Sequence, residues 1–484
     1  MKHIQLVALA FLAATIGGSV ALCDRNMGVM ANPKLVAPEL QAAKLTANFD
    51  KPQYYLGENV LLQFVVENSG DKPLKIDTGS DYRSAPRSMR FEVHAISADG
   101  TVCEDPFPDA MCEGGLGGTS ILQRGERFSA SLPLMRYCRI DKAGTYKITV
   151  SHDFGWKQDK QHTPFASAEV TFVMPTAEQA ALVVENMTKL PKASANLSGQ
   201  LRADYQDFST LAYPVYLLLL KELALKEAAA GSAQSEFPSL NGLSGIATPQ
   251  AAAALLSLAQ HKNPDMSLKA MQTLNLRLPD PMWSGELSGR SPFENPLLKE
   301  RKRLHMLSWR SEFEPEARTI AKELLARPQI EAVQCGAFVI ECVGSKDDVG
   351  LLIAALDTAI AQTVNLKPEL NYPRPRGAAQ ELMRAATILV RRGAPVPDAP
   401  HSDGERALFL TAIGQNSKFR PAGWQAIYQK LMMCPVPYIR ELALLNMPHP
   451  MDAGMKSLLS TLLQDKNEDV RIAACKVLED EPDQ

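Results

Sequence analysis

The chain has 484 residues, of which 45% are hydrophobic and 22% charged, and this composition excludes an intrinsically disordered protein. Its formal net charge of -3 excludes the strong basic field that gathers nucleic acid or anionic lipid. The length is sufficient for about two to four domains.

The first residues, MKHIQLVALAFLAATIGGSVALC, run from positive charge through an apolar stretch to small residues. This order is typical of a secretory signal peptide, so we expect residues 1–21 to be removed after Ala21 and residues 22–44 to form a linker. Cys23 suggests a lipid anchor, but Leu22 stands where a lipoprotein signal has a small residue, so the unanchored form is favoured. The sequence predicts a soluble periplasmic or extracellular protein, since no later apolar run reaches the ~20 residues of a membrane span.

Residues 45–175 show the period of β-strands. Apolar residues alternate with polar ones in four stretches, at 60–66, 91–95, 146–150 and 168–174, so that even Met174 is expected on the buried face. Turns rich in glycine, asparagine and aspartate separate these stretches. Several short strands that each bury one face predict an antiparallel β-sandwich.

Asp77-Thr78-Gly79-Ser80 follows a strand-like run and is similar to the active-site loop of pepsin-like aspartic proteases. Those enzymes use two carboxylates that share one proton, so one chain must supply two such loops or pair with another copy. The sequence has no second Asp-Thr/Ser-Gly loop. We therefore interpret Ile76 as the end of a strand and residues 77–79 as its exit turn, with no catalytic role for Asp77.

Two further segments of this region invite a functional interpretation. His152 and Asp153, followed by Phe154 and Trp156, suggest a carbohydrate platform, but His152 continues the strand alternation and is better explained as a partly buried strand residue. The glycine-rich 113–120 segment lacks the lysine of a phosphate-binding loop and predicts a flexible hairpin.

Export would place the cysteines in an oxidising compartment, where nearby pairs tend to close. Cys103 and Cys112 flank a turn-rich loop and are the disulfide candidates. Cys138 is left over unless it competes for one of these two or pairs with Cys23.

The remaining cysteines lie in the C-terminal part of the chain. Cys335 and Cys342 are seven positions apart on a predicted helix, about 10 Å along its axis, which is beyond disulfide reach. Together with Cys434 and Cys475 they are expected to be small core residues.

From residue 176 to 484 the apolar period becomes helical. Thr248 followed by Pro249 predicts a helix start, with Thr248 as the N-cap. Residues 265–274 and 469–478 match in an acidic first residue and in apolar residues at the second, fourth, seventh and tenth positions. One helical hairpin cannot bury its own apolar face, so this internal repetition predicts stacked helix pairs.

NEDVRIAACKVLED, near the C terminus, resembles the second helix of a HEAT repeat, a family of the armadillo type. The resemblance implies an irregular α-solenoid of about four to six units, in which Asp469 and Arg471 stitch neighbouring repeats. Proline- and glycine-rich breaks at 279–296, 365–379 and 391–405 would make the array irregular, and a non-repetitive helical bundle is the alternative.

YYLGENVLLQFVVENSGDKPLKI, in the N-terminal region, resembles immunoglobulin-like modules of exported bacterial proteins. This resemblance covers residues 45–175 and implies a fold rather than a ligand.

Motifs of catalysis and metal binding are missing from the sequence. It has no His-Glu-x-x-His, no Cys-x-x-Cys and no Gly-x-Ser-x-Gly, so we expect no catalytic residue, no cofactor and no metal. The basic cluster Lys299, Arg301, Lys302 and Arg303 predicts a solvated helix face rather than an anion site.

The sequence therefore predicts an exported, non-catalytic scaffold that binds an unidentified protein partner through its solenoid surface. One alternative is an enzyme or enzyme accessory, since HEAT-like arrays also occur in phycobiliprotein lyases. The other is a sandwich that binds a glycan or inhibits a protease, with the helical region as a spacer.

Overall fold

The computed structural model describes residues 38–80, 87–106, 117–156, 163–190, 206–230, 237–281, 296–363, 374–448 and 451–479. The expected signal peptide, most of the linker, Cys23 and Cys112 lie outside the described residues. The chain divides into two compact units, Met1–Thr210 and Leu211–Gln484, which we call the β unit and the helical unit. A β region followed by a helical region is therefore confirmed.

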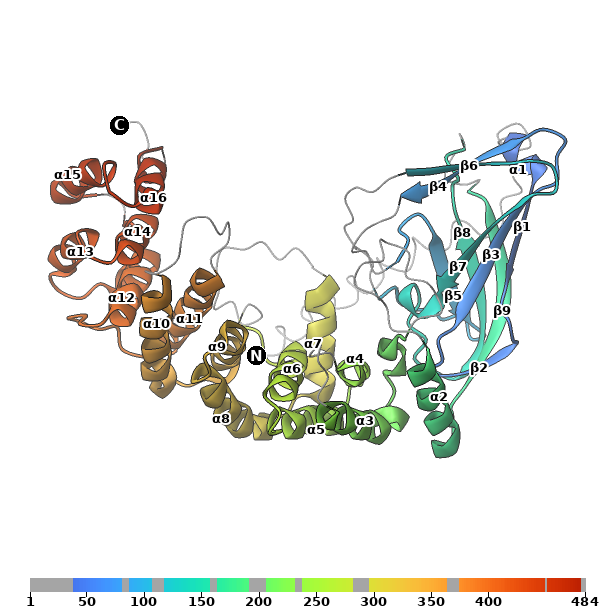
Figure 1. The fold of residues 1–484 in the computed structure, drawn as a ribbon, viewed down its shortest axis with the longest axis horizontal. Helices are drawn as coiled ribbons and strands as arrows, with labels where there is room; N and C mark the ends of the chain where they lie inside the picture. Colours follow the sequence, from blue (N-terminus) through green and yellow to red (C-terminus); the bar gives the residue numbers. More distant parts are fainter. Residues whose placement is uncertain are drawn as a thin grey trace, which may run out of the picture. The chain divides into compact units, whose positions relative to one another are not determined.

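Two larger sheets and one two-stranded sheet make up the β unit, after a short helix α1 (Pro38–Ala42) (Figure 1). In the first sheet β3 (Leu61–Asn68) lies between β1 (Ala43–Asn48) and β7 (Arg127–Pro133). The second sheet has the order β2 (Gln53–Tyr55), β9 (Phe165–Val173), β8 (Gly144–Ser151) and β5 (Glu92–Ser97). The third pairs β4 (Leu74–Ser80) with β6 (Gly117–Leu122).

The core of the β unit follows the alternation in the sequence. Leu62, Phe64 and Val66 of β3 are fully buried, and the residues between them are partly exposed. Ile148 of β8 is likewise fully buried. The rings of Phe64 and Phe91 lie edge to face with centroids 5.8 Å apart, so the buried side of the first sheet meets the residue just before β5 of the second sheet.

Two details of the sheets differ from expectation. β2 pairs in parallel with β9, because this three-residue strand joins the edge of a sheet whose next strand comes much later in the chain, so no hairpin fixes its direction. Met174 is 53% exposed rather than buried, because β9 ends at Val173 and the chain leaves the sheet there.

The helix α2 (Ala177–Lys189) groups with the β unit. Thr176 caps its start. Residues 207–210, later in the chain, also contact the β unit. Arg136 forms an ion pair of 2.7 Å with Asp207, and the Thr210 hydroxyl donates to the Gly57 carbonyl at 2.9 Å. The division at 210/211 therefore falls later than the boundary at 175/176 drawn from the change of period.

The described part of the helical unit is built mainly from α-helices. They are α3 (Leu217–Ala229), α4 (Pro238–Gly245), α5 (Pro249–Ala259), α6 (Pro264–Leu274), α7 (Pro296–Ser308), α8 (Glu314–Leu325), α9 (Ile330–Val343), α10 (Val349–Thr363), α11 (Arg374–Arg391), α12 (Asp403–Gln415), α13 (Trp424–Met432), α14 (Pro437–Leu445), α15 (Ala453–Leu462) and α16 (Glu468–Glu479).

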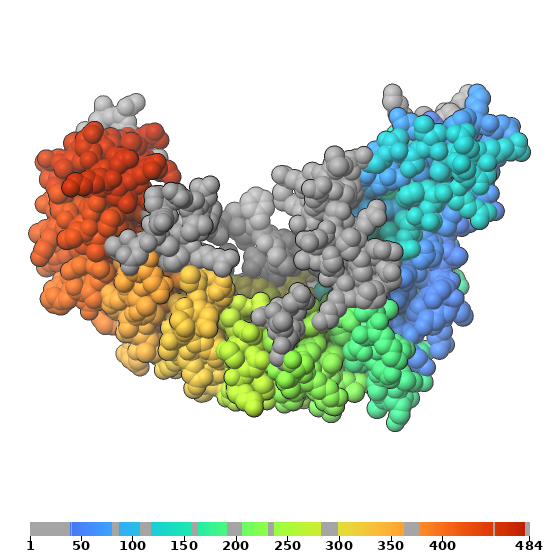
Figure 2. All heavy atoms as spheres, in the orientation of Figure 1, coloured from blue at the N-terminus to red at the C-terminus, as the bar shows by residue number. Residues whose placement is uncertain are grey.

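These helices pack chiefly on their neighbours in the chain. α5 packs on α6, α8 on α9, α10 on α11, α13 on α14 and α15 on α16, and further contacts join α6 to α9, α9 to α11, α12 to α14 and α14 to α16. Figure 2 shows the same succession, since the colours of the helical unit follow one another in sequence order. The predicted start of α5 is confirmed, because the Thr248 hydroxyl accepts a hydrogen bond from the Ala251 N–H.

The cysteines of the helical unit test the predicted core. Cys335 and Cys342 share α9 and are buried, as is Cys434, but Cys475 of α16 is exposed, so that prediction is wrong for Cys475. Its counterpart in the matched segment, Met271 of α6, is fully buried. The helix pair α8 and α9 follows α6, and α9 packs against α6. By contrast, no described helix follows α16.

Candidate functional site

The segment that is similar to a protease loop is the last part of β4 and not a turn after it. β4 continues through Asp77 to Ser80, and its register against β6 shifts between Asp77 and Gly79. The Asp77 carboxylate accepts the Gly79 N–H at 2.9 Å, and Gly79 has a φ of 83°, which a residue with a side chain rarely adopts. The predicted exit turn is therefore wrong, and residues 77–79 form a bulge within the strand.

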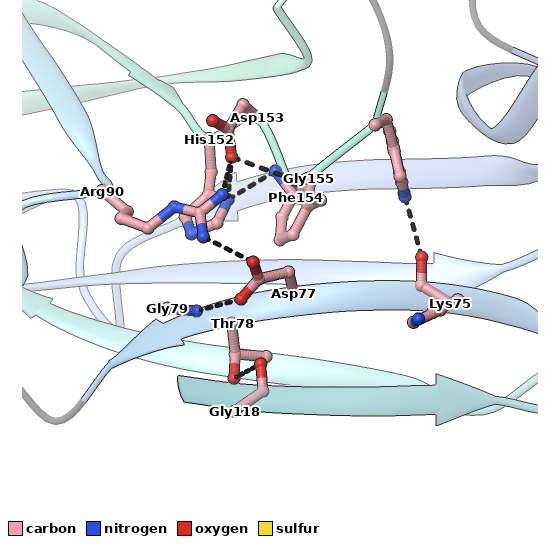
Figure 3. Close-up of polar contacts among 11 residues, drawn as sticks. Lys75, Asp77, Thr78, Gly79, Arg90, Gly118, His152, Asp153, Phe154 and Gly155 are labelled. Carbon is pink, nitrogen blue, oxygen red and sulfur yellow. Dashed lines mark hydrogen bonds and ion pairs between the residues drawn. The ribbon is translucent and has the colours of Figure 1, made fainter. Parts of the chain in front are cut away.

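An arginine from the segment before β5 connects Asp77 to a second carboxylate (Figure 3). Arg90 donates from Nη1 to Asp77 Oδ2 at 2.8 Å and from Nη2 to Asp153 Oδ1. The hydrogen bond from Arg90 is the main reason that the pKa of Asp77 lies below its usual range. Burial acts to raise the pKa of Asp153, but hydrogen bonds from Arg90 and from the Gly155 N–H outweigh it, and this pKa is also lowered.

This geometry differs from that of an aspartic protease. A catalytic dyad shares one proton, which requires the pKa of one carboxyl group to be raised. In this cluster Arg90 lies between Asp77 and Asp153 and lowers the pKa of both, so both are ionised at neutral pH. We call the residues Asp77, Arg90, His152 and Asp153 the Arg90 cluster.

The fourth member of the Arg90 cluster is a buried histidine. His152 is 1% exposed, and its Nδ1 accepts the Phe154 N–H at 2.8 Å. Its Nε2 has no hydrogen-bond partner in the part of the chain that the structure describes. Burial, followed by the charge of Arg90, lowers the pKa of His152 to about 4, so the imidazole is neutral at pH 7.

The His152 ring is part of an aromatic stack. It lies 4.3 Å from the ring of Phe154, which in turn stacks parallel to Phe64 at 6.1 Å and lies 5.2 Å from the ring of Trp156. Phe154 and Trp156 are buried, so they do not form an exposed platform for a sugar. His152 is buried as well, but β8 ends at Ser151, so the prediction of a partly buried strand residue is wrong about the strand. The stack packs the 152–156 turn onto the core.

Backbone contacts close the same turn over β4. The Asp77 N–H donates to the Phe154 carbonyl at 3.0 Å, and the Trp156 indole N–H donates to the Lys75 carbonyl at 2.8 Å. Phe154 has a φ of 52°, and among the described residues it is the only one other than glycine with a positive φ. A Cβ at Gly155 would lie 3.1 Å from that of Asp77, so the turn approaches the strand too closely for a larger residue.

The predicted cysteine and repeat residues are found in separate places. Cys103 is a free thiol, and Cys112 lies outside the described residues. Asp469 lies in the first turn of α16, and Arg471 donates to the Asp465 and Lys466 carbonyls in the turn before its own helix.

Within the described ranges, no group of three or more His, Cys, Asp or Glu residues is placed to hold a metal ion, and no helix is long and apolar enough to cross a membrane.

Two successive helix pairs are joined by an ion pair that sequence reasoning missed. Arg440 of α14 holds Asp465, in the turn before α16, through two hydrogen bonds of 2.8 and 2.7 Å. The side chains of both are almost buried. Arg440 also donates to the Cys434 and Pro435 carbonyls, six and five positions earlier. Arg471 makes the same two contacts at the same separations, and this shared spacing is the signal that could have identified Arg440.

A cluster of aromatic and basic residues lies across α7, α9 and α11. The guanidinium of Arg301 lies 5.2 Å from the ring centroid of Phe338, and that of Arg384 lies 6.0 Å from it. Phe338 is partly exposed, as is Arg384, which forms an ion pair with the buried Glu341. We call Arg301, Phe338 and Arg384 the Phe338 surface.

The prediction of a solvated basic helix face is wrong for Arg301. Its side chain is only 17% exposed and pairs with Asp280 at 2.6 Å. Arg303, two positions on, is paired with Glu300 on the same helix. The basic run therefore divides between a packed face and a surface ion pair.

Comparison with known proteins adds no assignment. No protein-family model matches the chain, and a search of curated proteins finds no match to it.

Proposed function

We propose that the protein is an exported scaffold that binds a protein partner and does not act as an enzyme. In this proposal the β unit is an immunoglobulin-like sandwich and the helical unit is an irregular HEAT-like α-solenoid. Solenoids suit this task because stacked units offer an extended surface rather than one deep pocket.

The recurring contacts of two arginines support the solenoid. Arg440 and Arg471 occupy the same place in successive second helices and bind the carbonyls of the turn before them in the same way. Arg440 adds the ion pair to Asp465 of the next turn. A stacked array requires a local structure that repeats from unit to unit, which the carbonyl contacts provide, and contacts between units, of which the Arg440–Asp465 pair is one.

The observation that carries the binding function is the Phe338 surface. Arginine and aromatic residues dominate the binding energy of protein interfaces, where they combine apolar area with directional hydrogen bonds. Three helices from different parts of the chain place two arginines against one partly exposed phenylalanine. Since Glu341 and Asp280 already balance much of the positive charge, the surface suits a protein segment with an apolar or aromatic anchor.

Quantitative pull-down from an envelope extract tests this function. We expect the full-length chain to enrich a specific protein, and Phe338→Ala to lose at least tenfold of that enrichment. Phe419→Ala, a partly exposed phenylalanine elsewhere in the helical unit, is the matched control and should retain the enrichment. Equal capture by all three chains, or no enriched protein at all, would contradict the proposal.

Export is tested separately. When the full chain is expressed in a secreting host, N-terminal sequencing of the exported protein should begin at Leu22, after loss of residues 1–21. A chain that stays in the cytoplasm with Met1 intact would refute export and leave the Phe338 result standing.

A further inference from the structure

Two cysteines contact the same edge of β5, Cys103 through its backbone and Cys138 through its thiol. The Cys103 N–H donates to the Ala95 carbonyl at 2.8 Å, and the Cys138 thiol lies 3.5 Å from the Val93 carbonyl. Carbonyls two residues apart on a strand point to the same side and are about 7 Å apart. The Cys103 backbone N–H and the Cys138 thiol therefore contact successive carbonyls on the same strand edge.

Separate contacts hold the segments that carry these cysteines together. The Arg139 N–H donates to the Glu104 carbonyl at 2.8 Å. The residue that follows Cys138 therefore contacts the residue that follows Cys103. Arg87 makes two hydrogen bonds of 2.7 Å to the Asp105 carboxylate and a third, of 3.0 Å, to the Arg136 carbonyl. A direct backbone hydrogen bond and a bridge through Arg87 thus hold residues 103–105 beside residues 136–139.

The direction of the Cys103 side chain favours contact with Cys138. Ile96 and Val102 form an antiparallel bridge, which places Cys103 opposite Ala95. Directly opposed residues of an antiparallel pair point to the same face, and Ala95 is fully buried. The thiol of Cys103 is therefore directed toward the interior, where Cys138 is 1% exposed.

We propose that Cys103 and Cys138 form a disulfide when the protein is exposed to a thiol-disulfide oxidant, in place of the pairing of Cys103 with Cys112 that the sequence favours. The oxidant is a dithiol-disulfide exchange protein or a small-molecule disulfide such as glutathione disulfide. The Cys103 thiolate, which is the more exposed of the two, attacks the oxidant and forms a mixed disulfide, releasing one thiol. The Cys138 thiolate then attacks the Cys103 sulfur and releases the second thiol, so two protons and two electrons leave the protein.

The reactivity of the two thiols indicates whether the disulfide forms in the folded or in the unfolded chain. Burial raises the pKa of Cys103 to about 11 and raises that of Cys138 further, so both thiols are protonated in the folded protein at neutral pH. The exchange is therefore slow in the folded protein and fast in the unfolded chain. Once formed, the bond joins two segments that are already tethered and resists reduction.

The experiment maps disulfides in the full chain. Protein refolded with glutathione disulfide is alkylated, digested without reductant and analysed by mass spectrometry. We expect a peptide pair joined through Cys103 and Cys138, two hydrogens lighter than the sum of its thiols, in the wild type and in Cys112→Ser. A pair joined through Cys103 and Cys112, or complete alkylation of Cys103 and Cys138, would overturn the proposal.

A thermal measurement supplies the second readout. Reductant should lower the unfolding midpoint of the oxidised wild type by roughly 5–10 °C, and it should not change that of Cys138→Ala. An equal effect of reductant on Cys138→Ala would assign the stabilisation to another pair. The outcome is independent of the Phe338 experiment, since it needs no partner.

Discussion

Arg90 in the β unit and Arg440 in the helical unit are both held by carboxylates, yet their surroundings differ. The partners of Arg90, Asp77 and Asp153, have side chains that are 42% and 57% exposed. Arg440 and its partner Asp465 are 13% and 10% exposed. Because exposed ion pairs contribute little, we expect the aromatic stack beside the Arg90 cluster to stabilise that site more than its charges do. Breaking the almost buried Arg440 pair should instead be costly in itself.

The largest effect should follow from removing the ring beneath the Arg90 cluster. Phe154→Ala leaves a cavity between Phe64 and Trp156, and we expect it to lower the free energy of unfolding of the β unit by about 3–5 kcal/mol. Hydrogen exchange of β3 and β8 peptides in the full chain measures the loss. Phe165→Ala, at an exposed position on β9, is the control and should cost less than about 0.5 kcal/mol. Similar costs for the two variants would contradict the primary role of the stack.

The Arg440 pair should give the next largest effect. Arg440→Ala leaves the Asp465 carboxylate almost buried without its arginine, and we expect a loss of about 3 kcal/mol from the end of the helical unit. Arg471→Ala removes the same two carbonyl contacts without breaking that ion pair, so its cost should stay near 1 kcal/mol. Hydrogen exchange of α14 and α16 peptides compares the two. If both variants open these helices equally, the ion pair is not what joins them.

Structural features that depend on neighbours in the sequence could be predicted in both units. The alternation of β3 and the cap at Thr248 depend on neighbours in the sequence, and both are found as expected. The exit turn at residues 77–79 was wrong because the glycine and the Asp77 side chain serve equally well in a bulge. Local chemistry fixes the backbone conformation there, but the partner strand decides whether pairing continues.

Contacts between distant residues could not be predicted from the sequence. Arg90 is 13 positions from Asp77 and 63 from Asp153, and nothing in the local pattern names it as their partner. Phe338 and Arg384 meet only because α9 and α11 pack side by side. The carbonyl contacts of Arg440 are different, since the alignment of Arg440 with Arg471 was available in the sequence. Contacts that repeat with the fold are predictable, whereas contacts made once by tertiary packing, such as the ion pair of Arg440 with Asp465, are not.

Acid should weaken the Arg90 cluster through His152 before it affects the carboxylates. The pKa of His152 is lowered in the folded protein to about 4, below the value of ~6.5 in an unfolded chain, so the unfolded state binds more protons between these values. Stability therefore falls as the pH drops from about 6.5 toward 4, with a loss of about 2 kcal/mol at pH 5. Arg90 opposes the charge on His152, while Asp77 and Asp153 favour it.

His152→Asn isolates this pH dependence, because the amide oxygen can still accept the Phe154 N–H but cannot titrate. Urea unfolding of the full chain at pH 7 and pH 5, followed in β-unit peptides by hydrogen exchange, compares the variant with the wild type. We expect most of the pH difference to vanish in the variant. A difference of unchanged size would assign the acid sensitivity to other groups.

The smallest effect should come from Asp77, whose local sequence first suggested catalysis. Asp77→Asn retains an oxygen that accepts the Gly79 N–H and loses only the ion pair, while Arg90 still holds Asp153. Because the Asp77 side chain is well exposed, the loss should stay below about 1 kcal/mol at pH 7. The lowered pKa means that the carboxylate contributes above its unfolded pKa and loses that contribution as the pH falls through its folded value, so wild type and variant should converge at low pH. A cost near that of Phe154→Ala would show that the charges, rather than the rings, hold the turn on β4.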